Sequence, residues 1–192
     1  MQFNVDWNAS QSPNGPLPSP SFGQLRASPA QAEEQAPRVT VVQCTSVNVV
    51  HRLFSSALSE EKNVQCYGRA AMSLHGHKLD FEIKFSGPVV RATGQILGAG
   101  PLDDVMTLAV HEVLENQNLD TDVPFFLSRP STLENIALLV YRNLSVILAP
   151  SPVSASEVTV ETVPCPRAGQ RVIQKTRVTF AGEMMAVPPS SS

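Results

Sequence analysis

Histidines carry the clearest chemical signal in this sequence. Three of the four fall in two short segments, one at His51 and the others at His75 and His77. Residues two apart in a β-strand project from the same face, so His75 and His77 are expected side by side. Two inward-facing imidazoles are costly to bury unless their nitrogens are satisfied. The pattern leaves two alternatives open, which are a zinc site completed by His51 and a set of hydrogen-bonded core histidines.

The remaining histidine and the cysteines offer less chemistry. His111 lies in a segment of helical periodicity and is expected on a helix surface rather than as a fourth ligand. The three cysteines, Cys44, Cys66 and Cys165, are an odd number without close spacing. This count argues against a disulfide framework and against a metal site built from cysteine alone. A reducing, cytoplasmic location is therefore expected.

Strands are expected to position these histidines. Residues 75–85 alternate, and one face carries the two histidines and four apolar side chains, Leu79, Phe81, Ile83 and Phe85. This period of two predicts a half-buried strand. Residues 39–50 are rich in β-branched side chains and predict a long strand that ends next to His51. Gly87 and Pro88 predict a turn, followed by a further strand over 89–97.

The rest of the pattern predicts two helices and two more strands. Apolar residues recur at helical spacing over 102–115 and 132–148, and Ser131 with Glu134 has the form of a capping box at the start of the second helix. Residues 156–163 and 171–180 predict strands. Runs of strands flanking a helix pair indicate an α+β fold, with an antiparallel sheet and helices on one face.

Composition bounds the domain organisation and the partners. Residues 1–37 are rich in Ser, Pro and Gln and are expected to form a flexible extension, as are residues 183–192, so the globular domain is expected over 38–182. The net charge of −3 gives no basic excess for nucleic acid. No apolar run reaches the roughly 18 residues that a membrane helix needs, and the N-terminus has neither a signal-peptide nor a transit-peptide pattern.

Ordered motifs over roughly residues 38–182 resemble the 6-pyruvoyl-tetrahydropterin synthase family. They include H-G-H at 75–77, forms similar to N-L-D…D-V-P-Y-F and S-T-T-E-N, and a terminal V-x-E-T. The matches form five groups in chain order: 51–55 with 58–63, 67–69 with 75–77, 118–120 with 122–126, 131–135, and 160–162. A lone H-x-H would be weak support, whereas five ordered matches are specific.

The resemblance implies a T-fold, in which a four-stranded antiparallel sheet carries two helices on one face. It implies that three subunits close a barrel and that two trimers stack into a homo-hexamer. It also implies one zinc per subunit, held by His51, His75 and His77. Glu161 would anchor the guanidine-like edge of a pterin, and Thr132 would help to line the pterin pocket. The implied activity is a lyase reaction of tetrahydrobiopterin biosynthesis, the elimination of triphosphate from 7,8-dihydroneopterin triphosphate.

Two positions depart from the family pattern. The family's synthases have a cysteine base just ahead of H-G-H, and this chain has Ala70 or Ala71 there, depending on the alignment. The family's Asp-His element is replaced by Glu115 and Asn116. Alanine and asparagine do not titrate, so both proton-transfer positions are lost. The nearest cysteine, Cys66, is expected to be a buried structural thiol.

These departures leave three functions to weigh. The first is a synthase whose activity is impaired by the two replacements. The second is a pterin-binding relative that kept its pocket and has no turnover. The third is a lyase on a different pterin, with Glu115 as acid or base. Glu115 also fits a solvated charge at the end of a helix.

Overall fold

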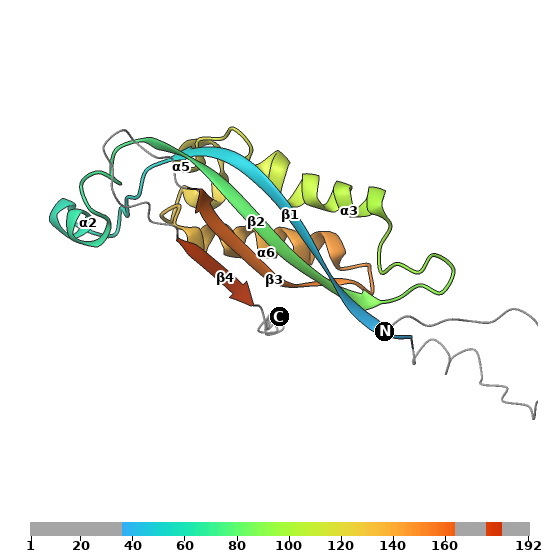
Figure 1. The fold of residues 1–192 in the computed structure, drawn as a ribbon. Helices are drawn as coiled ribbons and strands as arrows, with labels where there is room; N and C mark the ends of the chain where they lie inside the picture. Colours follow the sequence, from blue (N-terminus) through green and yellow to red (C-terminus); the bar gives the residue numbers. More distant parts are fainter. Residues whose placement is uncertain (1–35, 164–175, 182–192) are drawn as a thin grey trace, which may run out of the picture. The chain divides into compact units, whose positions relative to one another are not determined.

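A computed structural model of the chain describes residues 36–163 and 176–181 (Figure 1). The predicted tail at 183–192 lies outside these residues, as does the predicted extension at 1–37 except for its last two positions. The first half of the strand predicted over 171–180 also lies outside them. Within the described residues, no helix has both the length and the apolar character that crossing a bilayer requires.

Four antiparallel strands form one sheet in the order β1-β2-β3-β4, as the sequence predicts. The strands are β1 (Arg38–His51), β2 (His75–Pro88), β3 (Ser154–Val163) and β4 (Arg177–Ala181). The register of β1 and β2 pairs His51 with His75 and Val49 with His77. Because cross-strand partners share a face, this register places the three histidines on the same side of the sheet.

Helices pack against one face of the sheet (Figure 1). The long helix α6 contacts β3 and β4, and α3 contacts α6. A π-helical segment continues α3, which is typical of a helix that accommodates one inserted residue. The helical elements are α2 (Glu60–Tyr67), α3 (Ala99–Met106), the π-helical η1 (Thr107–His111), α4 (Glu112–Leu114), α5 (Leu119–Asp122), the 3-10 helix η2 (Pro124–Phe126) and α6 (Leu133–Leu148). This arrangement confirms the predicted fold class.

The core lies between the sheet and these helices. Alternate residues of β2 are buried, and they are the apolar set that the alternation predicts: Leu79, Phe81, Ile83 and Phe85. Burying a side chain of this size stabilises the fold by about 1.5–3 kcal/mol. The histidine end of β2 continues the same face, so packing of the apolar residues fixes the direction of the histidine side chains.

Three predictions about local structure are wrong. Residues 89–97 form a turn rather than a strand, with a single bridge between Val90 and Gln95, because Gly94 adopts a positive φ of 70° that breaks an extended segment. Pro88 ends β2 rather than marking a turn. The N-cap of α6 is Thr132, whose side chain accepts a hydrogen bond from the Asn135 backbone N–H, and not Ser131.

A connecting segment covers the outer edge of β1 near its end. The backbone N–H of Asn116 donates to the carbonyl of Asn48 at 2.7 Å, and the N–H of Val50 donates to the carbonyl of Gln117 at 3.0 Å. Asn116 adopts a positive φ of 59°, which asparagine tolerates better than most residues. These contacts hold the end of β1, and with it His51, in a fixed position.

Candidate metal centre

The three predicted histidines converge at one end of the sheet. Ring centroids are 4.8 Å apart for His51 and His75, 5.3 Å for His51 and His77, and 4.9 Å for His75 and His77. Each residue offers one ring nitrogen, and these nitrogens all lie within 4.8 Å of one another. The two strands therefore bring together a three-imidazole donor set of the kind that binds zinc.

Hydrogen bonds fix which nitrogen of His51 faces the other rings. Nδ1 of His51 lies 2.9 Å from the carbonyl oxygen of Ser131 and 3.0 Å from its Oγ. The Ser131 hydroxyl donates to Oδ1 of Asp120 at 2.8 Å, so its oxygen acts as an acceptor toward the ring. Both partners of Nδ1 accept, and Nδ1 therefore carries the proton. Nε2 of His51 is left with its lone pair available to a metal.

His75 is held in the same way. Its Nδ1 lies 2.6 Å from the carbonyl oxygen of Ser73, which accepts and never donates. Nδ1 therefore carries the proton, and Nε2 offers the lone pair. A backbone or carboxylate partner on the far ring nitrogen is the usual arrangement around histidines that bind metals.

Burial and charge lower the pKa of two of the three histidines. Burial, together with repulsion from His75 and His77, lowers the pKa of His51 to about 4. Burial and then the proximity of His75 lower the pKa of His77. Metal binding needs neutral imidazole, so these shifts favour the binding form. The donor set, the tautomers of His51 and His75, and the lowered pKa values of His51 and His77 all fit zinc.

His111 is not part of this cluster. It lies at the end of the π-helical segment, with Nε2 2.7 Å from Oγ1 of Thr45 on β1. Its Nδ1 lies 3.8 Å from a carboxylate oxygen of Glu115. His111 therefore joins a helix to the sheet and is half-buried rather than fully on the surface.

The residues at the family's catalytic positions have structural partners. Glu115 accepts weak hydrogen bonds from the backbone N–H and the side-chain amide of Asn48, at 3.4 and 3.3 Å. Asn116 holds the edge of β1. The carbonyl of Ala71 accepts from the N–H of Leu53 at 2.8 Å, whereas Ala70 is exposed. The backbone of Ala71 is thus hydrogen-bonded to Leu53, which lies two residues after His51.

The prediction of a buried thiol at Cys66 is wrong. Cys66 is exposed on α2, a short helix whose only fully buried residue is Asn63. The side chain of Asn63 anchors this helix by accepting from Ser55 N–H and donating to nearby carbonyls. The hydrogen bonds of the Asn63 amide therefore hold α2 against the chain, as a buried apolar face does in longer helices. Cys66 lies on the exposed side of α2.

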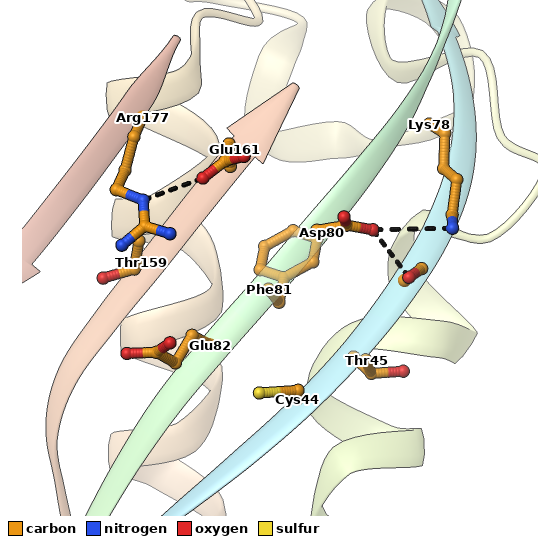
Figure 2. Close-up of a pocket in the computed structure, with 10 residues that line it drawn as sticks. Cys44, Thr45, Lys78, Asp80, Phe81, Glu82, Thr159, Glu161 and Arg177 are labelled. Carbon is orange, nitrogen blue, oxygen red and sulfur yellow. Dashed lines mark hydrogen bonds and ion pairs between the residues drawn. The ribbon is translucent and has the colours of Figure 1, made fainter. Parts of the chain in front are cut away.

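Glu161 lies on the opposite face of the sheet from the helices (Figure 2). It lines a cavity of 370 Å³ that we call the outer-face pocket, together with Asp80, Glu82, Lys78, Thr159 and Arg177. The carboxylate is 5% exposed and accepts a hydrogen bond from Nε of Arg177 at 2.8 Å. The other predicted pterin contact, Thr132, begins α6 on the helix side. One chain therefore presents the two predicted pterin contacts on different faces.

Sequence reasoning missed the residues that orient His51. Ser131 and Asp120 both fall in motifs that carry the family resemblance, but neither was assigned to the histidines. Their places in these motifs are the sequence signal that could have found them. The distance of 80 residues between His51 and Ser131 hides the contact, and Ser131 followed three residues later by Glu134 suggested a helix cap instead.

Comparisons with known proteins find relatives of this chain. The family model for 6-pyruvoyl tetrahydropterin synthase matches residues 41–168. The chain is 35% identical over 104 residues to the 6-pyruvoyl tetrahydrobiopterin synthase of Homo sapiens, covering 54% of this chain and 72% of the relative. It is 31% identical over 131 residues to that of Drosophila melanogaster, covering 68% and 77%. The solved 6-pyruvoyl tetrahydropterin synthase of Caenorhabditis elegans aligns with a TM-score of 0.65 and 30% identity, over 77% of this chain and 97% of that one.

Proposed function

Because the chain belongs to the 6-pyruvoyl tetrahydropterin synthase family, we propose that it is a zinc-binding pterin protein of tetrahydrobiopterin synthesis. Family membership supports the pathway. The proposed reaction is elimination of triphosphate from 7,8-dihydroneopterin triphosphate, at a rate below that of a complete synthase. The convergence of three imidazole nitrogens within 4.8 Å is the observation that carries this proposal.

His51, His75 and His77 would hold one zinc per chain. Once bound there, zinc would supply a Lewis acid that polarises oxygen atoms of the substrate side chain. The chain's own residues orient this site. Ser131 holds the ring of His51, and the Ser73 carbonyl holds the ring of His75, so two of the three ligands are aligned in advance.

Proton transfer is the step that this chain lacks. Asn116 and, depending on the alignment, Ala70 or Ala71 occupy the family's catalytic positions and cannot take up or release a proton near neutral pH. A positioned acid or base typically contributes about 10²–10⁴-fold to a rate, so losing two groups leaves a slow enzyme. This loss also favours the second candidate, a pterin-binding protein without turnover. A lyase acting on another pterin, with Glu115 as acid or base, is the third.

Pterin recognition is proposed at Glu161 and Thr132. A carboxylate suits the guanidine-like edge of a pterin, because two parallel N–H donors meet its two oxygens. Arg177 already presents a guanidinium to Glu161, so a pterin would replace a chemically similar group. Glu161 pairs with Asp80, three residues from His77, so both sites lie at the same end of the sheet. A pterin that contacts both would bind across that end or between two copies.

We also propose assembly through the sheet edges. Strands β1 and β4 are the outer strands, and each presents an edge that a second copy could extend. Within residues 36–163 and 176–181, residues 116–118 cover the end of β1. Three copies joined in this way would close a barrel, and two such trimers would give the hexamer. The functional unit is proposed to span residues 38–182 and to reside in the cytoplasm, where the exposed thiols of Cys44 and Cys66 stay reduced.

A turnover assay tests the proposed reaction. Zinc-loaded protein is mixed with 7,8-dihydroneopterin triphosphate, and released triphosphate is measured for the natural chain and for two double variants, which combine Asn116→His with Ala70→Cys or with Ala71→Cys. We expect slow release from the natural chain and faster release from one double variant, which identifies the position of the missing base. No release from any of these proteins, together with measurable pterin binding, would favour the candidate without turnover. No pterin binding at all would contradict all three functions.

A further inference from the structure

A second cavity lies next to the histidine cluster and has a positive character. It measures 240 Å³, and we call it the arginine pocket. Its polar lining consists of Arg52, Arg129, Ser55, Ser56, Ser128 and Asp120. We propose that this pocket binds a chain of phosphate groups, and specifically the triphosphate of the pterin substrate. The proposal rests on the proposed function and adds a site for the leaving group.

Two guanidinium groups supply the charge. Cζ of Arg52 lies 5.2 Å from the ring centroid of Phe54, and Cζ of Arg129 lies 4.2 Å from that of Phe125. Stacking on an aromatic face orients a guanidinium and leaves its N–H donors at the edge available. Among the residues that the structure describes, neither arginine is paired with a carboxylate. Arginine donors in this state suit phosphate, which accepts two parallel N–H bonds.

The one carboxylate in the lining does not cancel this charge. Oδ1 of Asp120 accepts from the Ser131 hydroxyl at 2.8 Å, and Oδ2 accepts from the backbone N–H of Arg52 at 2.7 Å. Both oxygens are therefore already engaged by donors. The two guanidinium groups outnumber this carboxylate, and the three serine hydroxyls add neutral donors.

The outer-face pocket offers the opposite environment. Its lining holds three carboxylates, Asp80, Glu82 and Glu161, against the two cations Lys78 and Arg177. A phosphate chain would be repelled there, whereas a donor-rich pterin edge would not be. The charge of each pocket thus suits a different end of one substrate, and the phosphate end belongs in the arginine pocket.

The position of the arginine pocket fits a leaving group. Its wall residue Asp120 is two hydrogen bonds from Nδ1 of His51, through the hydroxyl of Ser131. Arg52 follows His51 directly in the chain. Pockets that hold a whole small molecule usually measure about 300–1,000 Å³, so a cavity of 240 Å³ suits part of a ligand rather than an entire pterin.

Calorimetric titration with inorganic triphosphate, at about 0.15 M ionic strength to suppress nonspecific attraction, tests this inference. We expect Arg129→Gln to weaken triphosphate binding about tenfold or more and to leave neopterin binding unchanged. Arg142→Gln is the matched control, because Arg142 approaches the same ring of Phe125 at 5.9 Å but does not line the pocket. Arg52→Gln gives a second test should Arg129→Gln fold poorly. Zinc is measured after each titration, since triphosphate chelates divalent cations.

The outcomes separate this inference from the proposed function. Equal effects of Arg129→Gln and Arg142→Gln would overturn the inference. A chain that binds neopterin but not triphosphate would also overturn it, and would leave the pterin proposal standing. Triphosphate binding that depends on Arg129, in a chain that does not bind neopterin, would support the anion site and contradict the proposed function.

Discussion

His51 is the histidine that the rest of the chain holds most firmly. It is 5% exposed, and its ring is tied to Ser131, which is in turn tied to Asp120. Hydrogen bonds of this kind orient a ligand and raise its basicity. The side chains of Ser131 and Asp120 are thus positioning groups for the proposed metal, and Arg52 and Arg129 supply charge nearby.

Replacing Ser131 by alanine tests this positioning role. We expect Ser131→Ala to weaken zinc binding by about tenfold, near the lower end of the range for such partners because the Ser131 carbonyl still holds the ring. Competition with a coloured chelator measures the affinity. The neighbouring change Thr132→Ala is the control. It removes the N-cap of α6 and should lower stability by about 1 kcal/mol while leaving zinc affinity unchanged. Equal zinc affinities in the two variants would contradict the assignment.

Replacing Glu161 by glutamine tests pterin recognition at the same scale. A neutral amide cannot present two acceptors to a pterin edge, so we expect Glu161→Gln to weaken neopterin binding about tenfold or more in a fluorescence titration. The partner change Arg177→Gln removes the same ion pair but keeps the carboxylate, and it should preserve or strengthen binding. Equal weakening by both changes would mean that Glu161 acts only by joining β3 to β4.

Strand alternation accounts for much of the site at the scale of elements. The period of two in β2 places His75 and His77 on the face that also carries Leu79 and Phe81. The register with β1 then sets His51 opposite His75. Gly87 in β2 lies so close to Val153 that only a residue without a side chain fits there. An added Cβ would lie 2.8 Å from Cγ2 of Val153.

An alanine at Gly87 tests this close approach. We expect Gly87→Ala to lower the free energy of unfolding by about 1–3 kcal/mol, because the strand must shift away from Val153. Gly100→Ala in α3 is the matched change. An added Cβ there has no neighbour within 4 Å, and it should raise stability by about 0.5–1 kcal/mol. Urea unfolding followed by circular dichroism measures both. A Gly87→Ala variant as stable as Gly100→Ala would contradict this packing.

Local patterns predicted the elements better than they predicted their ends and contacts. The strands at 39–50, 75–85 and 156–163 and the helices at 102–115 and 132–148 follow from periodicity, and all five are confirmed. The strand at 89–97 was wrong because Gly94 permits a turn that composition does not reveal. The π-helical segment was not predicted, since an inserted residue leaves the apolar spacing almost unchanged.

For the candidate site, local patterns predict the neighbours within a strand but not the contacts between distant segments. Alternation within one strand predicts that His75 and His77 are neighbours, and the family resemblance adds His51. The hydrogen bonds that join His51 to Ser131 and Asp120 link three segments distant in sequence, so no local pattern predicts them. The contact of Arg177 with Glu161 was also unforeseen, because it depends on the register of β4 against β3.

The sheet of the whole molecule has two edges, and the proposed assembly depends on them. Asn48 and Val50 direct backbone groups outward to residues 116–118. Residues two apart in a strand share this direction, so the N–H of Val42 also points outward, toward the position of a second copy. The side chain of Val42 is 48% exposed in a single chain.

A proline at Val42 tests this edge. Val42→Pro removes an outward N–H and leaves the ladder between β1 and β2 intact, so we expect smaller assemblies by light scattering after size-exclusion chromatography. Val42→Thr keeps the N–H and should assemble like the natural chain. Circular dichroism shows whether each variant folds. A folded Val42→Pro variant of unchanged size, or a natural chain that is monomeric, would contradict assembly through β1.

X-ray absorption at the zinc edge tests the central claim most directly. For gently purified, zinc-loaded protein we expect one zinc per chain, with imidazole nitrogens at about 2.0–2.1 Å and no sulfur ligand. The same measurement on His51→Ala should show metal loss, whereas His111→Ala should match the natural chain. A spectrum with sulfur at about 2.3 Å, or a protein that retains no zinc, would contradict a metal centre at His51, His75 and His77.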